Sequence, residues 1–399
     1  MSTPISQRVS QLAASATLVM AQRATEMKAE GIDVINLSIG EPDFPTPEHI
    51  SRAAEEAIRQ HITHYTTVDG LLPLRQAVCD KLRKENGLKY DPAQIVISTG
   101  AKQSICNAIL SLVEEGDEVL LPTPTWLSYT QMIALSGAVC IELPTTIEQN
   151  YKLTPQQLEA AITPRTKLLI LCSPSNPTGS VYNKEEISAL ATVLRRHPQV
   201  YVISDEIYEH IRYTAEPHCS LAQQDDLKDR IIIVNGVSKA YAMTGWRIGW
   251  LAAHPDIAKA CKKLQGQYTS CASSISQMAA LEAYNGPQDC VETMRRVFQN
   301  RRNLVLSLAS QLPNIRFNQP DGAFYLLMDV KAYIGKKYQN TVITDSAALT
   351  LFLLEQGHVT LVDGAPFGAS GTIRLSYAAS EDDIQEAFRR LRSTLALLN

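Results

Sequence analysis

The most constraining feature of this sequence is a series of short apolar runs that end in polar residues. The runs QIVIST, EVLLP, KLLILC, YVISD, IIIVNG and GWLAAH alternate with helical stretches. They are almost continuously hydrophobic, which is typical of parallel strands covered by helices on both faces. Thr46 and Pro47, ahead of the amphipathic ISRAAEEAIRQ, predict a capped helix start. We therefore predict a large α/β domain over residues 47–284.

The last third of the chain has a different pattern. A long helical stretch, ETMRRVFQNRRNLVLSLASQL, leads to DGAFYLLMDV, a second helix, TIRLSY and a terminal helix. Ser380 and Asp383 match a capping box at the start of that last helix. One face of the helix carries apolar residues at helical spacing, namely Ile384, Phe388, Leu391 and Leu395. We predict a smaller α+β domain over residues 285–399, completed by residues 1–46.

Charge and hydropathy exclude several kinds of partner. The chain has 399 residues and a formal net charge of -4, which leaves no basic footprint for nucleic acid or anionic lipid. Its apolar runs fall far short of the roughly 20 residues that a membrane helix needs. We expect neither nucleic-acid nor membrane partners, whereas small anions can still bind in local cationic pockets.

The cysteines and the first residues indicate a compartment. The eight cysteines are scattered and contain no C-x-x-C pair, so we predict neither a metal site nor a redox pair. They are too few for a disulfide scaffold in a chain of this length, which favours a reducing environment. The opening MSTPISQRVSQLAASATLVM lacks a basic region followed by an apolar stretch, as a signal peptide would have. We expect a cytoplasmic protein.

Polar residues follow five of the apolar runs. Ligands of open α/β sheets collect beyond the carboxyl ends of the strands, so these residues are candidates for one shared site. They are Gly100-Ala101-Lys102, Thr125-Trp126, the segment from Ser173 to Gly179, Asp205-Glu206-Ile207-Tyr208, and Val237-Ser238-Lys239. Convergence of five such ends on one crevice is harder to attribute to chance than any single one.

Lys239 directly follows a buried apolar strand. Partial desolvation at this place lowers the pKa of the amine and makes its neutral form available for a Schiff base with an aldehyde. Taken alone, a strand-end lysine that extends to solvent is the more ordinary interpretation.

Three further features have a functional and an ordinary interpretation. Arg247 lies between apolar residues and glycines, where a buried guanidinium needs either a phosphate or an internal carboxylate. Asp205 ends an apolar strand and needs a cation, such as a protonated pyridine nitrogen, unless it caps a helix. The segment Gly100-Ala101-Lys102 predicts a helix start whose N–H groups suit a phosphate, although many strand–helix turns contain glycine.

Together these residues resemble class I aminotransferases of pyridoxal-phosphate (PLP) fold type I. The matching segments are Asn176-Pro177-Thr178-Gly179, Asp205-Glu206-Ile207-Tyr208, Ser238-Lys239, Gly245-Trp246-Arg247 and Arg374, with Gly40 to Phe44, Tyr65-Thr66 and Gly322 to Tyr325. The resemblance covers nearly the whole chain. It looks closest to the bacterial aspartate aminotransferase branch, which also contains prephenate aminotransferases. The fold implied is a mainly parallel seven-stranded sheet between helices, beside the smaller α+β domain.

The resemblance implies a role for each matching residue. Lys239 would hold PLP as a Schiff base and move a proton between substrate and cofactor, while Asp205 would hold the pyridinium proton. The other cofactor contacts would be Tyr208 and Asn176 at the ring oxygen, Trp126 on the ring face, and Gly100, Ala101, Lys102, Ser238, Arg247 and Tyr65 at the phosphate. Tyr65 would act across a homodimer with shared active sites. Substrate would contact Gly40, Trp126, Asn176, Arg374 and Lys102.

These roles imply transamination by a ping-pong mechanism, in which L-aspartate and 2-oxoglutarate exchange an amino group. The pyridinium would delocalise the charge left on the α-carbon. A positioned base increases the rate of proton removal by a factor of about 10²–10⁴. Gly236 departs from the pattern, because several family members have a serine there. The corresponding phosphate contact must be missing or come from Ser238.

Lys102 decides which substrate we expect. In the branch that this chain resembles, a lysine here faces the distal carboxylate of aspartate or glutamate, which favours a dicarboxylic pair over neutral or aromatic amino acids. A solvated first-turn lysine is the ordinary alternative, although the helix dipole opposes it. Prephenate is the alternative substrate, ranked below aspartate because Ala13 offers no charge to a bulky dianion.

Other functions fit this sequence less well. A PLP β-lyase or a cyclopropane-forming synthase would use the same lysine and would differ in its products. A transcription regulator with an aminotransferase-like domain needs a DNA-binding domain, and the residues before the large domain have no basic helix-turn-helix pattern. No G-x-G-x-x-G follows a strand, which disfavours a nicotinamide dehydrogenase.

Overall fold

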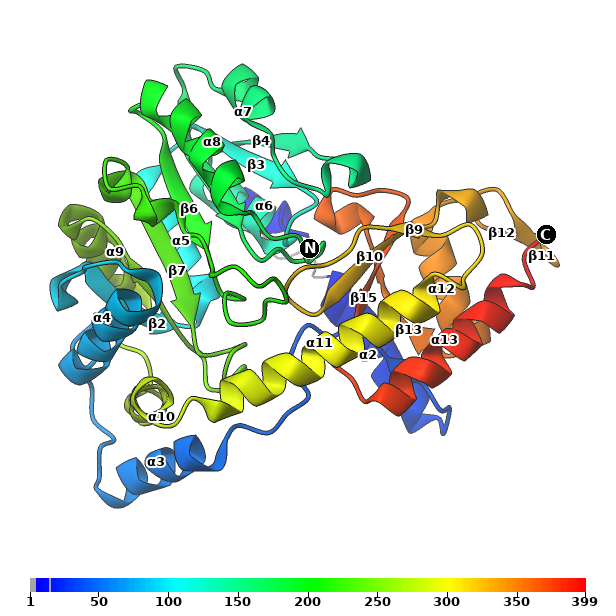
Figure 1. Ribbon diagram of the computed structural model, residues 1–399, viewed down its shortest axis with the longest axis horizontal. Coiled ribbons are helices and arrows are strands. Elements are labelled where there is room, and N and C mark those ends of the chain that lie inside the picture. Colours follow the sequence, from blue (N-terminus) through cyan, green and yellow to red (C-terminus); the bar gives the residue numbers. More distant parts are fainter. Residues whose placement is uncertain (1–4, 14–15) are drawn as a thin grey trace.

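A seven-stranded sheet forms the centre of the structure, a computed structural model that describes residues 5–13 and 16–399 (Figure 1). The strand order is β2-β8-β7-β6-β5-β3-β4. Every neighbouring pair is parallel except the two that β8 makes. The strands are β2 (Ile95–Thr99), β3 (Glu118–Thr123), β4 (Val139–Pro144), β5 (Thr166–Cys172), β6 (Tyr201–Asp205), β7 (Ile231–Gly236) and β8 (Ile248–Ala252). The predicted α/β fold is confirmed.

Helices cover both faces of this sheet. α5 (Ala101–Leu112), α6 (Ser128–Ser136) and α9 (Pro255–Tyr268) pack on one face. The other face is covered by α3 (Glu48–Arg59), α4 (Leu72–Asn86), α7 (Pro155–Ala161), α8 (Lys184–Arg196) and α10 (Ser274–Asn285). Along β5, Leu168 and Ile170 belong to the first of these cores, whereas Leu169 and Leu171 belong to the second. Burial on both sides explains why the strands are continuously hydrophobic.

A second hydrophobic cluster, called the second cluster below, joins the two ends of the chain. Its sheet has the order β14-β15-β10-β9, formed by β14 (Val362–Asp363), β15 (Thr372–Ser376), β10 (Tyr325–Asp329) and β9 (Arg316–Phe317). β1 (Ile35–Asn36) pairs in parallel with β13 (Val359–Thr360), which brings the N-terminal segment against the C-terminal part. α12 (Ser346–Gly357) and α13 (Glu381–Leu395) pack here, while β11 (Lys337–Tyr338) and β12 (Thr341–Val342) form their own antiparallel pair.

One long helix, α11 (Asp289–Ala309), runs along both parts of the molecule (Figure 1). At its start Cys290 contacts the core around the seven-stranded sheet as well as the second cluster, in which Phe298 is fully buried. The predicted domain limits, residues 1–46, 47–284 and 285–399, stay a prediction.

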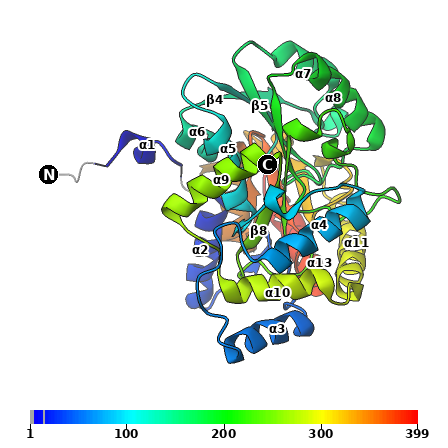
Figure 2. The same ribbon diagram turned by 90° about the vertical axis from the view of Figure 1, so that its left-hand side faces the viewer.

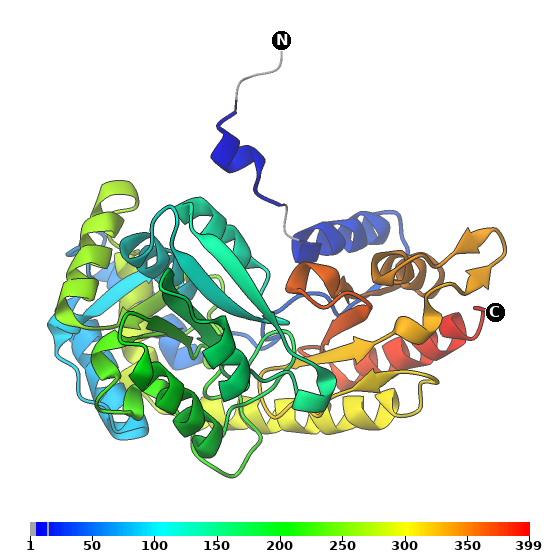
Figure 3. The same ribbon diagram turned by 90° about the horizontal axis from the view of Figure 1, so that it is seen from above.

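The remaining helices lie at the edges of the molecule. α3 and α10 pack side by side below the sheet (Figure 2). α2 (Ala16–Ala29) lies against β13 and β14 of the second cluster. α1 (Gln7–Ser10) projects away from the main body (Figure 3). Within the described residues, no helix combines the length and the apolar character of a membrane span.

Two predicted helix caps have different outcomes. Ser380 caps α13, since its hydroxyl accepts from the N–H of Asp383 (3.0 Å), and the four apolar residues of that helix are buried. The Thr46 cap is wrong, because Pro47 is the N-cap of α3 and makes no side-chain cap. The Thr46 hydroxyl instead donates to the carbonyl of Ala242 (2.8 Å) and accepts from Trp246 Nε1 (2.9 Å). A tertiary contact therefore takes the place of the local one.

Candidate active site

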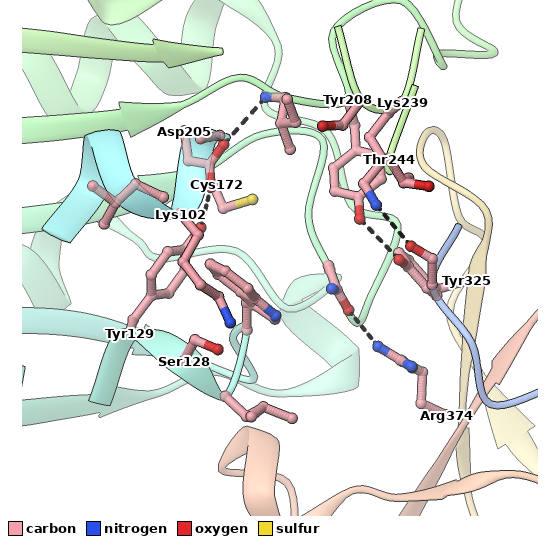
Figure 4. A pocket seen from close by; sticks show the side chains of 18 of the residues that line it. Lys102, Ser128, Tyr129, Cys172, Asp205, Tyr208, Lys239, Thr244, Tyr325 and Arg374 are labelled. Atoms are coloured by element: carbon pink, nitrogen blue, oxygen red, sulfur yellow. Dashed lines mark hydrogen bonds between the residues drawn. The ribbon is translucent and has the colours of Figure 1, made fainter. Parts of the chain in front are cut away.

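The strand ends converge on a cavity of about 310 Å³ (Figure 4). It lies where β5, β6 and β7 end and α5 begins, and residues of the second cluster close its other side. The predicted residues that line it are Gly40, Ala101, Lys102, Trp126, Asn176, Asp205, Tyr208, Ser238, Lys239, Arg247 and Arg374. The structure thus brings together residues from both ends and the middle of the chain.

Asp205 ends β6 and is almost completely buried. The hydroxyl of Tyr129 donates to its Oδ2 (2.6 Å), and the N–H of Ile207 donates to Oδ1 (3.2 Å). Burial raises the pKa of Asp205 to about 6, although the hydrogen bond from Tyr129 lowers it. The carboxyl group is therefore mostly ionised above pH 6 and can pair with a cation placed in the cavity.

Lys239 follows β7 and points into the same cavity (Figure 4). Its Nζ donates to the carbonyl oxygen of Gly40 (2.7 Å). Burial lowers the pKa of Lys239 to about 8, although the charge of Glu41 raises it. A far larger fraction of this amine is neutral near pH 7.5 than for an exposed lysine, which suits nucleophilic and proton-transfer chemistry.

The start of α5 forms a turn into which the backbone packs closely. Gly100 is its N-cap with φ +81°, and a Cβ at Gly249 would lie 2.5 Å from the carbonyl carbon of Gly100. A Cβ at Gly236 would lie 2.8 Å from the Cα of Gly249 and from the oxygen of Ile248. Since β7 and β8 approach so closely, this backbone has no room for a serine at position 236. Ser238, in contrast, lines the cavity.

Arg247 differs from the expectation that its side chain is buried. The side chain is exposed at the cavity and lies directly over Gly100, with Nη1 donating to the carbonyl of Thr244 (2.8 Å). Among the residues that the structure describes, no carboxylate lies within 4.0 Å of this guanidinium. The internal ion pair that the sequence left open is therefore not formed, and an external anion can approach.

Arg374 lies on β15 and is only 2% exposed. Its Nη1 donates to Asn176 Oδ1 (3.0 Å) and its Nη2 to the carbonyl of Ser38 (2.7 Å), while Nε has no hydrogen-bond partner in the described chain. Burial lowers the pKa of this guanidinium. A buried cation without a counter-ion has a strong affinity for a carboxylate, which the planar guanidinium binds in pairs of oxygens.

Lys102 lies in the first turn of α5. Its Nζ is 4.9 Å from the centre of the Trp126 ring, and both side chains line the cavity. Desolvation lowers the pKa of Lys102, and the charge of Arg247 lowers it further. The lysine is therefore turned toward the site.

Tyr65 does not line the cavity. Its side chain is 91% exposed, and the apolar side chains of Ile58 and Leu72, near it in the sequence, are more than half exposed. Within residues 5–13 and 16–399, these three large side chains are left mostly open to solvent.

Sequence reasoning missed two tyrosines of the site. Tyr129 hydrogen-bonds Asp205 and packs edge-on against Trp126, with ring centres 5.3 Å apart. Tyr129 lies in the first turn of α6, and no local pattern in the sequence indicated its bond to Asp205. Tyr325 hydrogen-bonds Tyr208 (2.8 Å); the resemblance included it in the segment Gly322 to Tyr325 but implied no role for it.

Comparisons with known proteins agree with this geometry. The Aminotransferase class I and II family matches residues 32–391. An aspartate/prephenate aminotransferase of Cereibacter sphaeroides is 45% identical, over 99% of each chain. The chain is also similar to the solved aspartate aminotransferase of Rhizobium meliloti, with 41% identity over all of both chains and a TM-score of 0.96. The Thermus thermophilus enzyme solved with maleate has 37% identity over 98% of this chain and 100% of the other, with a TM-score of 0.92.

The family match covers most of the chain. The alignments to the Cereibacter sphaeroides relative and to the Rhizobium meliloti structure cover nearly the full length of both partners. The convergent strand ends, the partly desolvated lysine and the buried carboxylate are found in the same chain. This protein belongs to the class I and II aminotransferases, enzymes that depend on pyridoxal phosphate.

Proposed function

We propose that the protein transfers an amino group between L-aspartate and 2-oxoglutarate, with PLP bound at Lys239. The charge of the cavity is the observation that carries this proposal. Lys102, Lys239, Arg247 and Arg374 line it, and Asp205 is the only carboxylate among the lining residues of the described chain. A phosphate and a dicarboxylic substrate would together neutralise these cations.

The residues present fit PLP. The N-terminal turn of α5, with Arg247 above it, offers a phosphate both N–H groups and a guanidinium that has no carboxylate partner in the described chain. Asp205 would pair with the ring nitrogen, while Tyr208 and Asn176 would bind the ring oxygen. Trp126 would lie against the ring face. When bound, PLP supplies the electron sink that lets an amino acid lose its α-proton.

The chain's own residues then bind substrate and move the proton. With a pKa of about 8, the Nζ of Lys239 can accept a proton and return it near neutral pH. Ionised Asp205 would hold a proton on the ring nitrogen. Arg374, whose Nε lacks a partner in the described structure, would bind the α-carboxylate beside Asn176 and the Gly40 backbone.

Lys102 would bind the distal carboxylate, which favours aspartate and 2-oxoglutarate over monocarboxylic substrates. The Thermus thermophilus enzyme supports this assignment, because it was solved with maleate, a four-carbon dicarboxylate. Lys102 and Arg374 line the same cavity, so one dicarboxylate could contact both cations.

We further propose a cytoplasmic homodimer. Tyr65 would contact the phosphate bound by the partner, which would account for its exposure and for the exposed Ile58 and Leu72 nearby. The eight cysteines are scattered along the sequence without a C-x-x-C pair, which favours a reducing compartment.

A spectroscopic titration of the purified holoenzyme tests the substrate. Aspartate, glutamate, tyrosine, alanine and kynurenine are added in turn, and conversion of the bound cofactor to its amine form is followed by absorbance. We expect aspartate and glutamate to react best, and Lys102→Ala to weaken these two more than tyrosine. Lys331→Ala, at an exposed lysine outside the cavity, is the matched control. An equal loss for all three donors would contradict the role of Lys102.

Prephenate is the second candidate acceptor. The name of the Cereibacter sphaeroides relative favours it. Amino transfer from aspartate or glutamate to prephenate, measured beside 2-oxoglutarate, ranks the two acceptors. Formation of pyruvate and ammonia without any oxo acid would instead indicate a β-lyase.

A further inference from the structure

Tyr325 contacts several groups of the site without belonging to its predicted residues. It lies in β10, where backbone pairing with Ser376 of β15 fixes its position, and its side chain is buried at the cavity. β10 belongs to the second cluster, whereas Tyr208 follows β6 of the large sheet. The tyrosine therefore reaches the site from the opposite side (Figure 4).

The hydroxyl of Tyr325 lies 2.8 Å from the hydroxyl of Tyr208. Burial raises the pKa of both phenols, so each keeps one proton to donate. If Tyr208 donates to the ring oxygen of the cofactor, its own oxygen is left to accept a hydrogen bond from another group. Tyr325 is the only side chain in the described structure that hydrogen-bonds this hydroxyl, so it would be the donor.

The ring of Tyr325 stacks on Arg374. The guanidinium carbon of Arg374 lies 4.6 Å from the centre of the Tyr325 ring and 4.9 Å from the centre of the Phe367 ring. Two aromatic rings therefore pack against this guanidinium. The hydroxyl end also packs against Gly40, where an added Cβ would overlap it. The carbonyl of Gly40 accepts the Nζ of Lys239. The Tyr325 side chain thus contacts Tyr208, Arg374 and the glycine that binds Lys239.

We propose that Tyr325 is a positioning residue that orients the Tyr208 hydroxyl toward the cofactor and holds the Arg374 guanidinium for the substrate carboxylate. The inference rests on the proposed function, since it takes the roles of Tyr208 and Arg374 from there. Its two parts use different atoms of the side chain, the hydroxyl and the ring, and can be separated by substitution.

The test compares Tyr325→Phe, which keeps the ring, with Tyr325→Leu, which loses both parts. The visible absorbance of bound PLP is titrated with pH, and maleate binding is measured by its effect on that absorbance. Without the hydroxyl, Tyr208 stabilises the deprotonated chromophore less. We expect the midpoint of this pH titration to be about half to one pH unit higher in Tyr325→Phe than in the wild type. Its maleate affinity should stay within about twofold of wild type, whereas Tyr325→Leu should bind maleate about fivefold more weakly.

Two controls separate positioning from general structural damage. Tyr333→Phe removes another buried hydroxyl of the same cluster, one that donates to Pro313 outside the cavity, and should change neither quantity. In a Tyr208→Phe background, Tyr325→Phe should no longer move the midpoint, because its effect passes through Tyr208.

An unchanged midpoint in fully loaded Tyr325→Phe would overturn the inference, as would a shift that persists in the Tyr208→Phe background. Either result leaves the proposed function intact if borohydride reduction still fixes the cofactor on Lys239 in the wild type. Absence of that label would reject the proposed function itself.

Discussion

The two sides of the cavity are built on different principles. The cofactor side comes from one sheet, whose parallel strands deliver Asp205 and Lys239 to a common edge. The substrate side is assembled from separate parts, with Arg374 on β15 held by Asn176 and by the carbonyl of Ser38. Topology positions the first side, whereas packing between the two ends of the chain positions the second. We therefore expect the first side to determine the chemistry, and the second to determine affinity and selectivity.

The largest effect is expected on the cofactor side. Lys239→Ala removes the only lysine at the end of β7 and should lower the transamination rate by at least about 10⁴, since covalent and proton-transfer functions are lost together. Stopped-flow absorbance with aspartate measures the rate. Lys184→Ala, on the exposed face of α8, should retain full activity. A Lys239 variant with a tenth of the wild-type rate would remove the basis of the comparison.

Substitution of Arg374 addresses the substrate side. Arg374→Lys keeps the charge but loses the paired donors and the stacking between Tyr325 and Phe367. We expect kcat/KM to fall by about 10²–10³ for every amino donor, while PLP affinity changes little. Steady-state kinetics and a fluorescence titration with PLP measure the two quantities. A parallel loss of cofactor affinity would show that the two sides are not independent.

Gly236→Ser tests how rigid the sheet is under the cofactor side. The new Cβ would meet the backbone of Gly249 and Ile248 at 2.8 Å. We expect the free energy of unfolding to fall by about 1–3 kcal/mol, as for other overpacked sites. Urea denaturation measures this change, with Gly245→Ser as the control because a Cβ there contacts nothing within 4 Å. Equal stabilities of the two variants would indicate that β7 and β8 separate easily.

Tyr129→Phe should give the smallest effect, and one that depends on pH. Burial raises the pKa of Asp205 to about 6 even though the hydrogen bond from Tyr129 lowers it, so the loss of that bond should raise this pKa further. PLP needs the ionised carboxylate, and its affinity for wild-type apoenzyme should weaken as the pH falls through about 6. In the variant the same weakening should begin about half to one pH unit higher. Above pH 8 the two proteins should bind PLP alike, and a loss that is independent of pH would contradict the role of Tyr129.

Much of the fold follows from the sequence, because buried strands are recognised by hydrophobicity alone. All six apolar runs form strands of the large sheet. The seventh strand, β4, was not among them, since it lies at the edge and exposes Val139 and other residues along its length. A strand whose residues are mostly only partly covered has a weaker hydrophobic signal.

Side-chain environments were harder to predict than side-chain positions. The motif residues Asp205, Lys239 and Arg374 do line one cavity, although their roles stay a prediction. Arg247 is exposed instead of buried, because the chain turns it outward over Gly100 just before β8. The hydrogen bonds of Tyr129 and Tyr325 join residues 76 and 117 positions apart, a separation that no local pattern contains.

The unpaired guanidinium of Arg374 has a consequence for the protein as a whole. A positive charge kept away from water and from any carboxylate of the described chain raises the free energy of the empty state. A carboxylate ligand removes that penalty only in the folded protein, so heat resistance should increase with ligand concentration. The protein would then resist unfolding and proteolysis best when its carboxylate substrates are abundant. Its lifetime in the cell would increase with their concentration.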